Sequence, residues 1–263
     1  MTSMRFSPDA YSRTRDERLL YPTVNAPRLL LLPGLDGTGD LFDPFVDALA
    51  SDVSSTVLRY TSPPLSSYSD CRAAVLARLP SDGSYLLVGE SFSGPIAIAI
   101  AAMRPPGLRG LVLVGSFVSS PRRMLRWLRP CIRFLPTHNA PRWMTDFLLL
   151  GRSAAPELRK RVGDAMAQIT PAVVRARLHE IALTDSSEDL RKIDVPILYL
   201  RASRDRLVPR SCADRIARLR PGTRIVDIEA PHLLLQCAPR ECAQVIGDFA
   251  RECCAGSRGA TAL

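Results

Sequence analysis

The sequence of 263 residues contains no run of about 18 uncharged apolar residues, so it offers no candidate for a membrane-spanning helix. Its first ten residues also lack the apolar core of a signal peptide. No two of the seven cysteines are spaced C-x-x-C, and zinc-type ligand clusters are absent. We therefore expect reduced thiols, no metal and no other cofactor, in a cytoplasmic protein without a membrane span.

Lysine and aromatic residues are scarce. Lysine appears only twice, so arginine carries almost all of the net charge of +9. An arginine-rich surface would suit an acidic partner such as an acyl carrier protein, although a solvated surface is the commoner role of charged helices. Because neither a zinc finger nor a basic-aromatic repeat is present, we expect no nucleic-acid partner. Aromatic residues form only 6% of a chain that is 46% hydrophobic, which predicts an aliphatic core.

Apolar runs that are typical of buried strands alternate with segments of helical periodicity along most of the chain. This alternation predicts an α/β fold with a mostly parallel central sheet and helices on both faces. Residues 1–26 lack periodicity, so we expect a trimmed sheet with six clear strands and one or two uncertain ones. The predicted strands are the run before Pro33 and residues 55–60, 84–90, 110–116, 195–203 and 223–230. The predicted helices are residues 40–50, 69–79 (capped by Ser69 or Asp70), 92–103, 211–219 and 241–253.

The pattern changes between residues 117 and 192, where strand-like runs stop and arginine-rich amphipathic helical segments follow. We expect this stretch to form a helical cap, or lid, over one end of a core made of residues 1–116 and 193–263. Apolar cap residues such as Trp127 and Trp143 are candidates for contact with a substrate. Packing of the cap on the core is the simpler explanation for most of them.

The segment VGESFSG, residues 88–94, places Ser91 between a strand-like run and a helical run. Such a serine is either a nucleophile at a sharp strand-to-helix turn or a polar residue in an ordinary tight turn. A serine nucleophile needs a general base and an acid that orients the base. Of the three histidines, His232 follows a predicted strand and precedes the last predicted helix, which places it at the carboxyl edge of the sheet. His138 and His179 lie in the predicted cap and are weaker candidates.

The best candidate for the acid is Asp205, which follows a predicted strand and would share the carboxyl edge with His232. Asp194 lies at the opposite end of that strand, and Asp227 lies inside the next one, so both are weaker. Serine, acid and histidine then follow one another in the chain order that is typical of α/β-hydrolases and differs from the chymotrypsin and subtilisin orders.

With this order, the segments LLPGLDGTG, VGESFSG, RASRDRLVP and APHLLLQCAPRECAQVIGDF resemble those of the α/β-hydrolase family over residues 27–251. The resemblance implies a serine esterase that needs no cofactor. It also implies an oxyanion hole built from the backbone N–H groups of Phe92 and Leu35, with Asp36 as the alternative donor and a candidate for substrate contact. The motif G-x-S-x-G is imperfect because Ser93 replaces its second glycine, but serine is nearly as small. Gly94 can relieve the remaining crowding, and the role of Glu90 stays open.

These residues predict hydrolysis of a small-molecule acyl ester through an acyl-enzyme on Ser91, with His232 as base and Asp205 as the orienting acid. An acyltransferase or a thioesterase, including a carrier-protein methyl-ester esterase, would use the same three residues. A binding protein without activity on the same scaffold is a further alternative. Such proteins often lose one of the three residues, and here all three are present.

Overall fold

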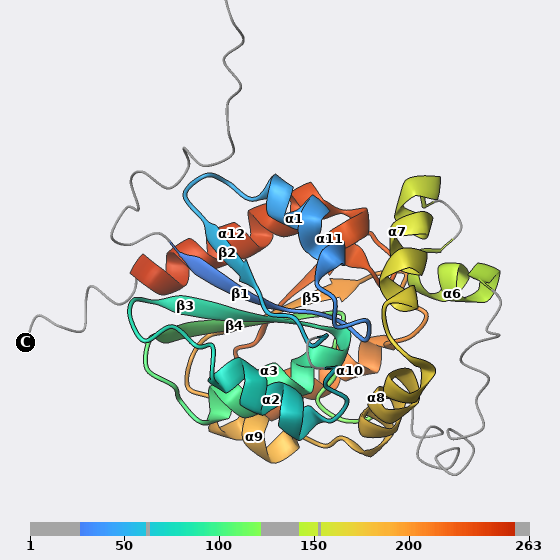
Figure 1. Ribbon diagram of the computed structural model, residues 1–263. Coiled ribbons are helices and arrows are strands. Elements are labelled where there is room, and N and C mark those ends of the chain that lie inside the picture. Colours follow the sequence, from blue (N-terminus) through green and yellow to red (C-terminus); the bar gives the residue numbers. More distant parts are fainter. Residues whose placement is uncertain (1–26, 62–63, 122–141, 152–153, 256–263) are drawn as a thin grey trace, which may run out of the picture.

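The computed structural model describes residues 27–61, 64–121, 142–151 and 154–255 (Figure 1). Within them, six strands form one sheet in the order β2-β1-β3-β4-β5-β6, and every neighbouring pair is parallel. This arrangement confirms the predicted α/β fold with a parallel central sheet. The strands are β1 (Arg28–Leu32), β2 (Ser54–Val57), β3 (Tyr85–Glu90), β4 (Leu108–Val114), β5 (Ile197–Ala202) and β6 (Arg224–Ile228).

Helices cover both faces of this sheet, because its central strands are apolar on both sides. Every residue of β3 is buried, and the side chains that meet on each face are mainly aliphatic, as the composition predicts. One face is covered by α1 (Asp43–Ala48), α11 (Leu234–Cys237) and α12 (Pro239–Ala255) (Figure 1). The other is covered by α2 (Tyr68–Leu76), α3 (Gly94–Ala102), α9 (Ser187–Lys192) and α10 (Arg210–Leu219).

Several helix starts differ from the sequence prediction. The cap of α2 is Ser67, and not Ser69 or Asp70, because the Ser67 side chain accepts a hydrogen bond of 3.0 Å from the Asp70 N–H. The predicted helices over residues 40–50 and 92–103 each begin with a short 3-10 turn, η2 (Asp40–Phe42) and η3 (Ser91–Ser93). The short helix α11 was not predicted.

Between β4 and β5 the chain carries α6 (Arg142–Leu149), α7 (Pro156–Ala167) and α8 (Pro171–Leu183) before it reaches α9. In Figure 1 these three helices lie beside the carboxyl ends of the strands, whereas α9 packs on α3.

The two ends of the stretch between β4 and β5 lie side by side. The Ser120 N–H donates to the Thr184 carbonyl (3.1 Å), and the Ser186 N–H donates to the Val118 carbonyl (2.8 Å). The division into a core and a cap over residues 117–192 stays a prediction. Trp127 lies outside the described residues, and α6 is described without the side chain of Trp143.

Among the described residues, no helix is long and apolar enough to cross a membrane, and no group of histidine, cysteine and acidic side chains could hold a metal ion. The six described cysteines are free thiols, and Cys131 lies outside the described residues. Burial raises the pKa of the Cys71 and Cys242 thiols to about 12, so both stay protonated at neutral pH.

Candidate active site

Ser91 stands at a sharp turn between β3 and α3. Its φ of 46° lies in the left-handed region, which residues other than glycine rarely adopt. The turn leaves room only for small neighbours. A Cβ at Gly89 would lie 3.0 Å from the Ala97 Cβ, and a Cβ at Gly94 would lie 1.7 Å from the Ser116 Oγ. The displaced glycine of the motif is therefore required where it stands, at position 94.

Ser93, at the motif's usual glycine position, links the serine turn to two other segments. Its side chain is fully buried, and its hydroxyl donates to the carbonyl of Pro33 and lies 2.9 Å from the Tyr60 hydroxyl. The motif alone predicts only a small side chain at this position. The structure adds a hydrogen-bonding role, because the Ser93 hydroxyl joins the turn to the loop that follows β1.

The structure brings Ser91, Asp205 and His232 together at the carboxyl edge of the sheet. The Ser91 Oγ lies 2.9 Å from His232 Nε2, and His232 Nδ1 lies 2.7 Å from Asp205 Oδ2. The other carboxylate oxygen of Asp205 accepts the backbone N–H groups of Leu207 (2.8 Å) and Val208 (2.9 Å). Because the loop holds Asp205 in this way, the carboxylate can orient the imidazole with Nε2 toward the serine. The histidine and aspartate side chains are 4% and 5% exposed.

The rival acids lie in other contacts, as expected. Asp194 Oδ2 lies 3.2 Å from Arg104 Nε, and Asp227 Oδ1 lies 2.6 Å from Arg201 Nε. Both acids belong to exposed ion pairs that do not include His232. His179 lies on α8, and His138 lies outside the described residues.

The loop after β1 contains the proposed oxyanion donor Leu35. Because Leu32 of β1 pairs in register with Gly89 of β3, this loop lies next to the serine turn. It begins with a tight turn in which the Gly37 N–H donates to the Gly34 carbonyl (3.1 Å). Within the described part of the chain, no hydrogen-bond acceptor faces the N–H of Leu35 or of Phe92. Free N–H groups beside a serine are what an oxyanion hole requires.

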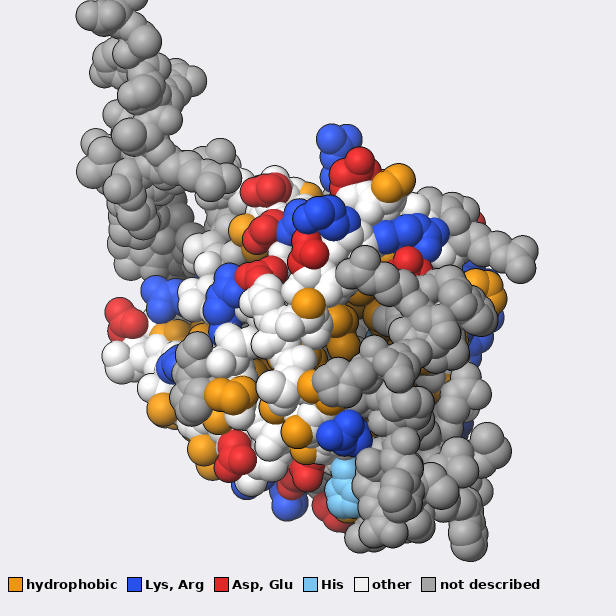
Figure 2. Space-filling view, turned by 45° about the vertical axis from the view of Figure 1, so that its right-hand side comes forward, with side chains coloured by type: hydrophobic (Ala, Val, Ile, Leu, Met, Phe, Trp, Pro, Cys, Tyr) orange, Lys and Arg blue, Asp and Glu red, His pale blue; other side chains and the backbone are white. Residues whose placement is uncertain are grey.

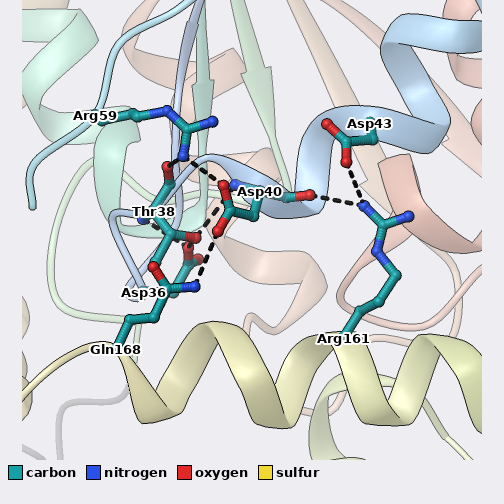
Figure 3. Close-up of polar contacts among 7 residues, drawn as sticks. All are labelled: Asp36, Thr38, Asp40, Asp43, Arg59, Arg161 and Gln168. Carbon is teal, nitrogen blue, oxygen red and sulfur yellow. Dashed lines mark hydrogen bonds and ion pairs between the residues drawn. The ribbon is translucent and has the colours of Figure 1, made fainter.

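Asp36, the candidate for substrate contact, has its side chain turned into its own loop (Figure 3). It is 6% exposed, and one carboxylate oxygen accepts both the N–H (2.8 Å) and the hydroxyl (2.5 Å) of Thr38. These bonds stabilise the loop and leave the side chain little freedom to reach a substrate.

The next residues of the loop are held by charged side chains at the surface, which Figure 3 shows. Arg59 forms an ion pair with Asp40 and donates a hydrogen bond to its carboxylate. This hydrogen bond is the main reason that the pKa of Asp40 is lowered. From α7, Arg161 donates to the Asp40 carbonyl and to the Asp43 carboxylate, both at 2.8 Å. Gln168, just after α7, donates to the Asp40 carboxylate (2.9 Å). These contacts attach α7 to η2.

Glu90 is a buried carboxyl group immediately before the serine. Its side chain is 3% exposed and accepts a hydrogen bond of 3.0 Å from the Gln236 amide and another from the Gly34 N–H. Burial is the main reason that its pKa rises from 4.5 to about 7. The Asp36 carboxylate adds to this rise, whereas Gln236 and His232 oppose it. Sequence reasoning left the role of Glu90 open because burial cannot be read from its place in the motif.

Arg177 is a second buried polar group near the site, and sequence reasoning missed it. It lies on α8 and is the largest side chain that is fully buried among the described residues. Its surroundings in the sequence, RARLHE, are those of a charged surface helix, so no local signal marks it as buried.

Figure 2 turns the carboxyl edge of the sheet toward the viewer. Hydrophobic side chains are visible near the centre of this face, and charged side chains gather along its upper part. Beside the site, an apolar cluster joins α7 to η2 and to the loop that carries His232. Its buried members are Leu41, Leu150, Val162, Ala165 and Leu233.

Comparisons with known proteins identify the family of this fold. Residues 29–245 match the model of the alpha/beta hydrolase family. The chain is 31% identical over 156 residues to the pyrrolizixenacetamide deacetylase of Xenorhabdus hominickii, a match that spans 56% of this chain and 58% of that protein. It is 26% identical over 226 residues to the pimeloyl-[acyl-carrier protein] methyl ester esterase of Nitrosomonas europaea. This match spans 78% of this chain and 87% of that protein. A solved thermophilic esterase from Thermogutta terrifontis shares the fold, with a TM-score of 0.71 at 20% identity over 86% of this chain and 90% of that one.

Proposed function

Because the chain belongs to the alpha/beta hydrolase family, we propose that it hydrolyses carboxylic esters of small molecules through an acyl-enzyme formed on Ser91. The observation that carries this proposal is the unbroken chain of hydrogen bonds from the Ser91 hydroxyl through His232 to Asp205. A serine hydroxyl is a weak nucleophile at neutral pH, and such a chain is the arrangement that activates it.

In the proposed reaction, the Ser91 oxygen attacks the ester carbonyl while His232 Nε2 takes the hydroxyl proton. The tetrahedral intermediate carries its negative charge on the former carbonyl oxygen, which the N–H groups of Leu35 and Phe92 stabilise. Loss of one such donor typically costs about 2–4 kcal/mol of transition-state stabilisation. The intermediate then expels the alcohol, which receives the proton from His232. Water, deprotonated by the same imidazole, releases the acid from Ser91.

Two relatives suggest which acyl group the substrate carries. One relative is a deacetylase, which favours a short acyl group, so acetate esters are the first substrates to test. A second candidate is an acyl ester carried by an acyl carrier protein, which the match to the Nitrosomonas esterase and the net charge of +9 favour. In either case we propose that residues 117–192 form a cap whose apolar residues, Trp127 and Trp143 among them, contact the acyl chain. Transfer to an alcohol or thiol in place of water is the remaining alternative.

The test is Ser91→Ala, assayed with p-nitrophenyl esters and thioesters of graded acyl length and with a fluorophosphonate probe. We expect kcat to fall by about 10⁴-fold or more, because attack and proton transfer both act on this hydroxyl. Labelling should vanish while the thermal unfolding curve stays that of the wild type. Ser81→Ala, which changes an exposed serine between α2 and β3, is the matched control. Full activity or persistent labelling in Ser91→Ala would overturn the proposal. A wild type that is neither labelled nor active would favour a binding protein.

A further inference from the structure

Arg177 reaches from α8 to three backbone carbonyls near the candidate active site. Its guanidinium donates to Leu35 (2.6 Å), to Leu65 (3.0 and 2.5 Å) and to Tyr60 (3.4 Å). The side chain is 0% exposed, and no described carboxylate forms an ion pair with it. A buried charge without an ion-pair partner is costly, so a protein retains one only where other groups stabilise it.

Backbone dipoles and aromatic rings supply that stabilisation. The guanidinium carbon lies 5.8 Å from the centre of the Tyr60 ring and 5.6 Å from the centre of the Phe92 ring. Burial lowers the pKa of Arg177, while the nearby Asp36 carboxylate opposes this change, and an arginine remains charged in either case. The guanidinium therefore contacts both residues whose N–H groups would form the oxyanion hole, the carbonyl of Leu35 and the ring of Phe92.

The carbonyl contacts fix the orientation of two successive peptide groups in the loop after β1. The Gly34 carbonyl accepts the Gly37 N–H, and the Leu35 carbonyl accepts Arg177. In a trans peptide the N–H points opposite to the C=O. Because the Gly34 carbonyl points into the turn, the Leu35 N–H of the same peptide group points away from the turn. The bond from Arg177 holds the following peptide and so prevents Leu35 from rotating.

The loop and the arginine are also fitted sterically. Gly37 has a φ of 68°, and a Cβ there would lie 2.5 Å from the Nη1 of Arg177. The Gly37 carbonyl also accepts the Tyr60 N–H at 2.8 Å, which joins this loop to the segment after β2. The loop thus encloses the guanidinium closely, with glycine where a side chain would collide with it.

We propose that Arg177 is a positioning residue of the hydrolysis, because its guanidinium holds the loop after β1 so that the Leu35 N–H points at the developing oxyanion beside the Phe92 N–H. This inference rests on the proposed function. It goes beyond it by assigning to α8, a helix between β4 and β5, a direct effect on the rate of the chemical step. A side chain that only anchored α8 would affect stability and leave catalysis per folded molecule unchanged.

The experiment compares Arg177→Met and Arg177→Lys with Arg161→Met, a variant that removes an exposed contact between α7 and η2. Active sites are counted with the fluorophosphonate, and kcat and KM for p-nitrophenyl acetate are expressed per labelled serine. Binding of phenylboronic acid, which forms a tetrahedral adduct on serine, reports the oxyanion hole without turnover.

For Arg177→Met we expect kcat to fall by about 10²-fold and boronate affinity to fall in parallel, with KM within about threefold, because only the tetrahedral state uses the hole. Arg177→Lys should recover part of both losses, and Arg161→Met should match the wild type within about twofold. If Arg177→Met does not fold, Arg177→Lys decides, with an expected loss of about tenfold in kcat and boronate affinity.

Two results separate the failure of this inference from that of the proposed function. If the folded Arg177 variants have the wild-type kcat per labelled serine and the wild-type boronate affinity, the role of Arg177 is overturned. The proposed hydrolase function is then unaffected. A wild-type protein that neither reacts with the probe nor cleaves any ester would overturn the function and the role of Arg177 with it.

Discussion

The loop after β1 is held in two different ways along its length. Residues 33–37 are fixed by buried groups, namely the Ser93 hydroxyl at the Pro33 carbonyl and the Arg177 guanidinium at the Leu35 carbonyl. Residues 38–43 bury Leu41 and Phe42 but make their ion pairs at the surface, where Arg161 and its partner Asp43 are exposed by 40% and 66% (Figure 3). The first part lies beside the serine turn, and the second part meets α7.

The two kinds of contact differ in how precisely they hold the backbone. A buried hydrogen bond is expensive to break, because no water is present to replace the lost partner. It therefore holds a peptide group in one orientation. An exposed ion pair typically contributes about 0–1 kcal/mol and exchanges readily with solvent. The buried hydrogen bonds can therefore hold an N–H group in place, while the exposed ion pairs add little to the apolar cluster that joins α7 to η2.

The largest expected effect concerns Glu90, which accepts the Gly34 N–H at the start of the buried part. Its pKa is about 7 in the folded protein and 4.5 when exposed, so between these values the folded state holds a proton that the unfolded state has released. The free energy of unfolding therefore falls as the pH rises through this window, by about 3 kcal/mol from this group.

Glu90→Gln should remove this component of the pH dependence. Its side-chain oxygen can still accept from Gln236, so the fold should persist. Urea unfolding from pH 4 to pH 8 measures the effect, and the variant should gain stability relative to the wild type as the pH rises. The control is Glu241→Gln, which changes an exposed carboxyl of α12. Parallel curves for wild type and Glu90→Gln would contradict the assignment.

The next effect concerns Ser93. Ser93→Ala removes the donor to the Pro33 carbonyl and the partner of the Tyr60 hydroxyl, both buried, and should lower the free energy of unfolding by about 1–3 kcal/mol. Ser93→Gly restores the G-x-S-x-G motif but also lacks the hydroxyl, so it should be destabilised at least as much. Denaturant unfolding checks both variants. A glycine variant as stable as the wild type would mean that only small volume matters at this position.

The smallest effect is expected in the exposed part of the loop. Arg161→Met removes the contacts to Asp43 and to the Asp40 carbonyl and should lower the free energy of unfolding by less than about 1 kcal/mol. The difference from the wild type should shrink further at high salt, because exposed charges are screened. Thermal unfolding at low and high ionic strength measures this. A salt-independent loss above about 2 kcal/mol would show that the two parts of the loop are held equally strongly.

Much of the fold follows from local patterns. The alternation of apolar runs and helical segments predicts the parallel sheet because each run is long enough to be buried on both faces. The positions of Ser91, Asp205 and His232 directly after predicted strands place all three at one edge of that sheet, where the structure has them. Helix starts were less predictable, since Ser67, Ser69 and Asp70 all have side chains that can cap a helix.

The architecture and the three residues at the carboxyl edge can be predicted from the sequence alone, because these depend on periodicity and on order along the chain. Three features are visible only in the folded chain: Gly94 must be small, the Ser93 hydroxyl links two segments, and Arg177 is buried. Each of these depends on which segment approaches from far along the chain. Ser116 faces Gly94, and the carbonyls that hold Arg177 come from two other loops. An arginine on a charged helix is exposed or enclosed according to what folds over it, and no local pattern carries that information.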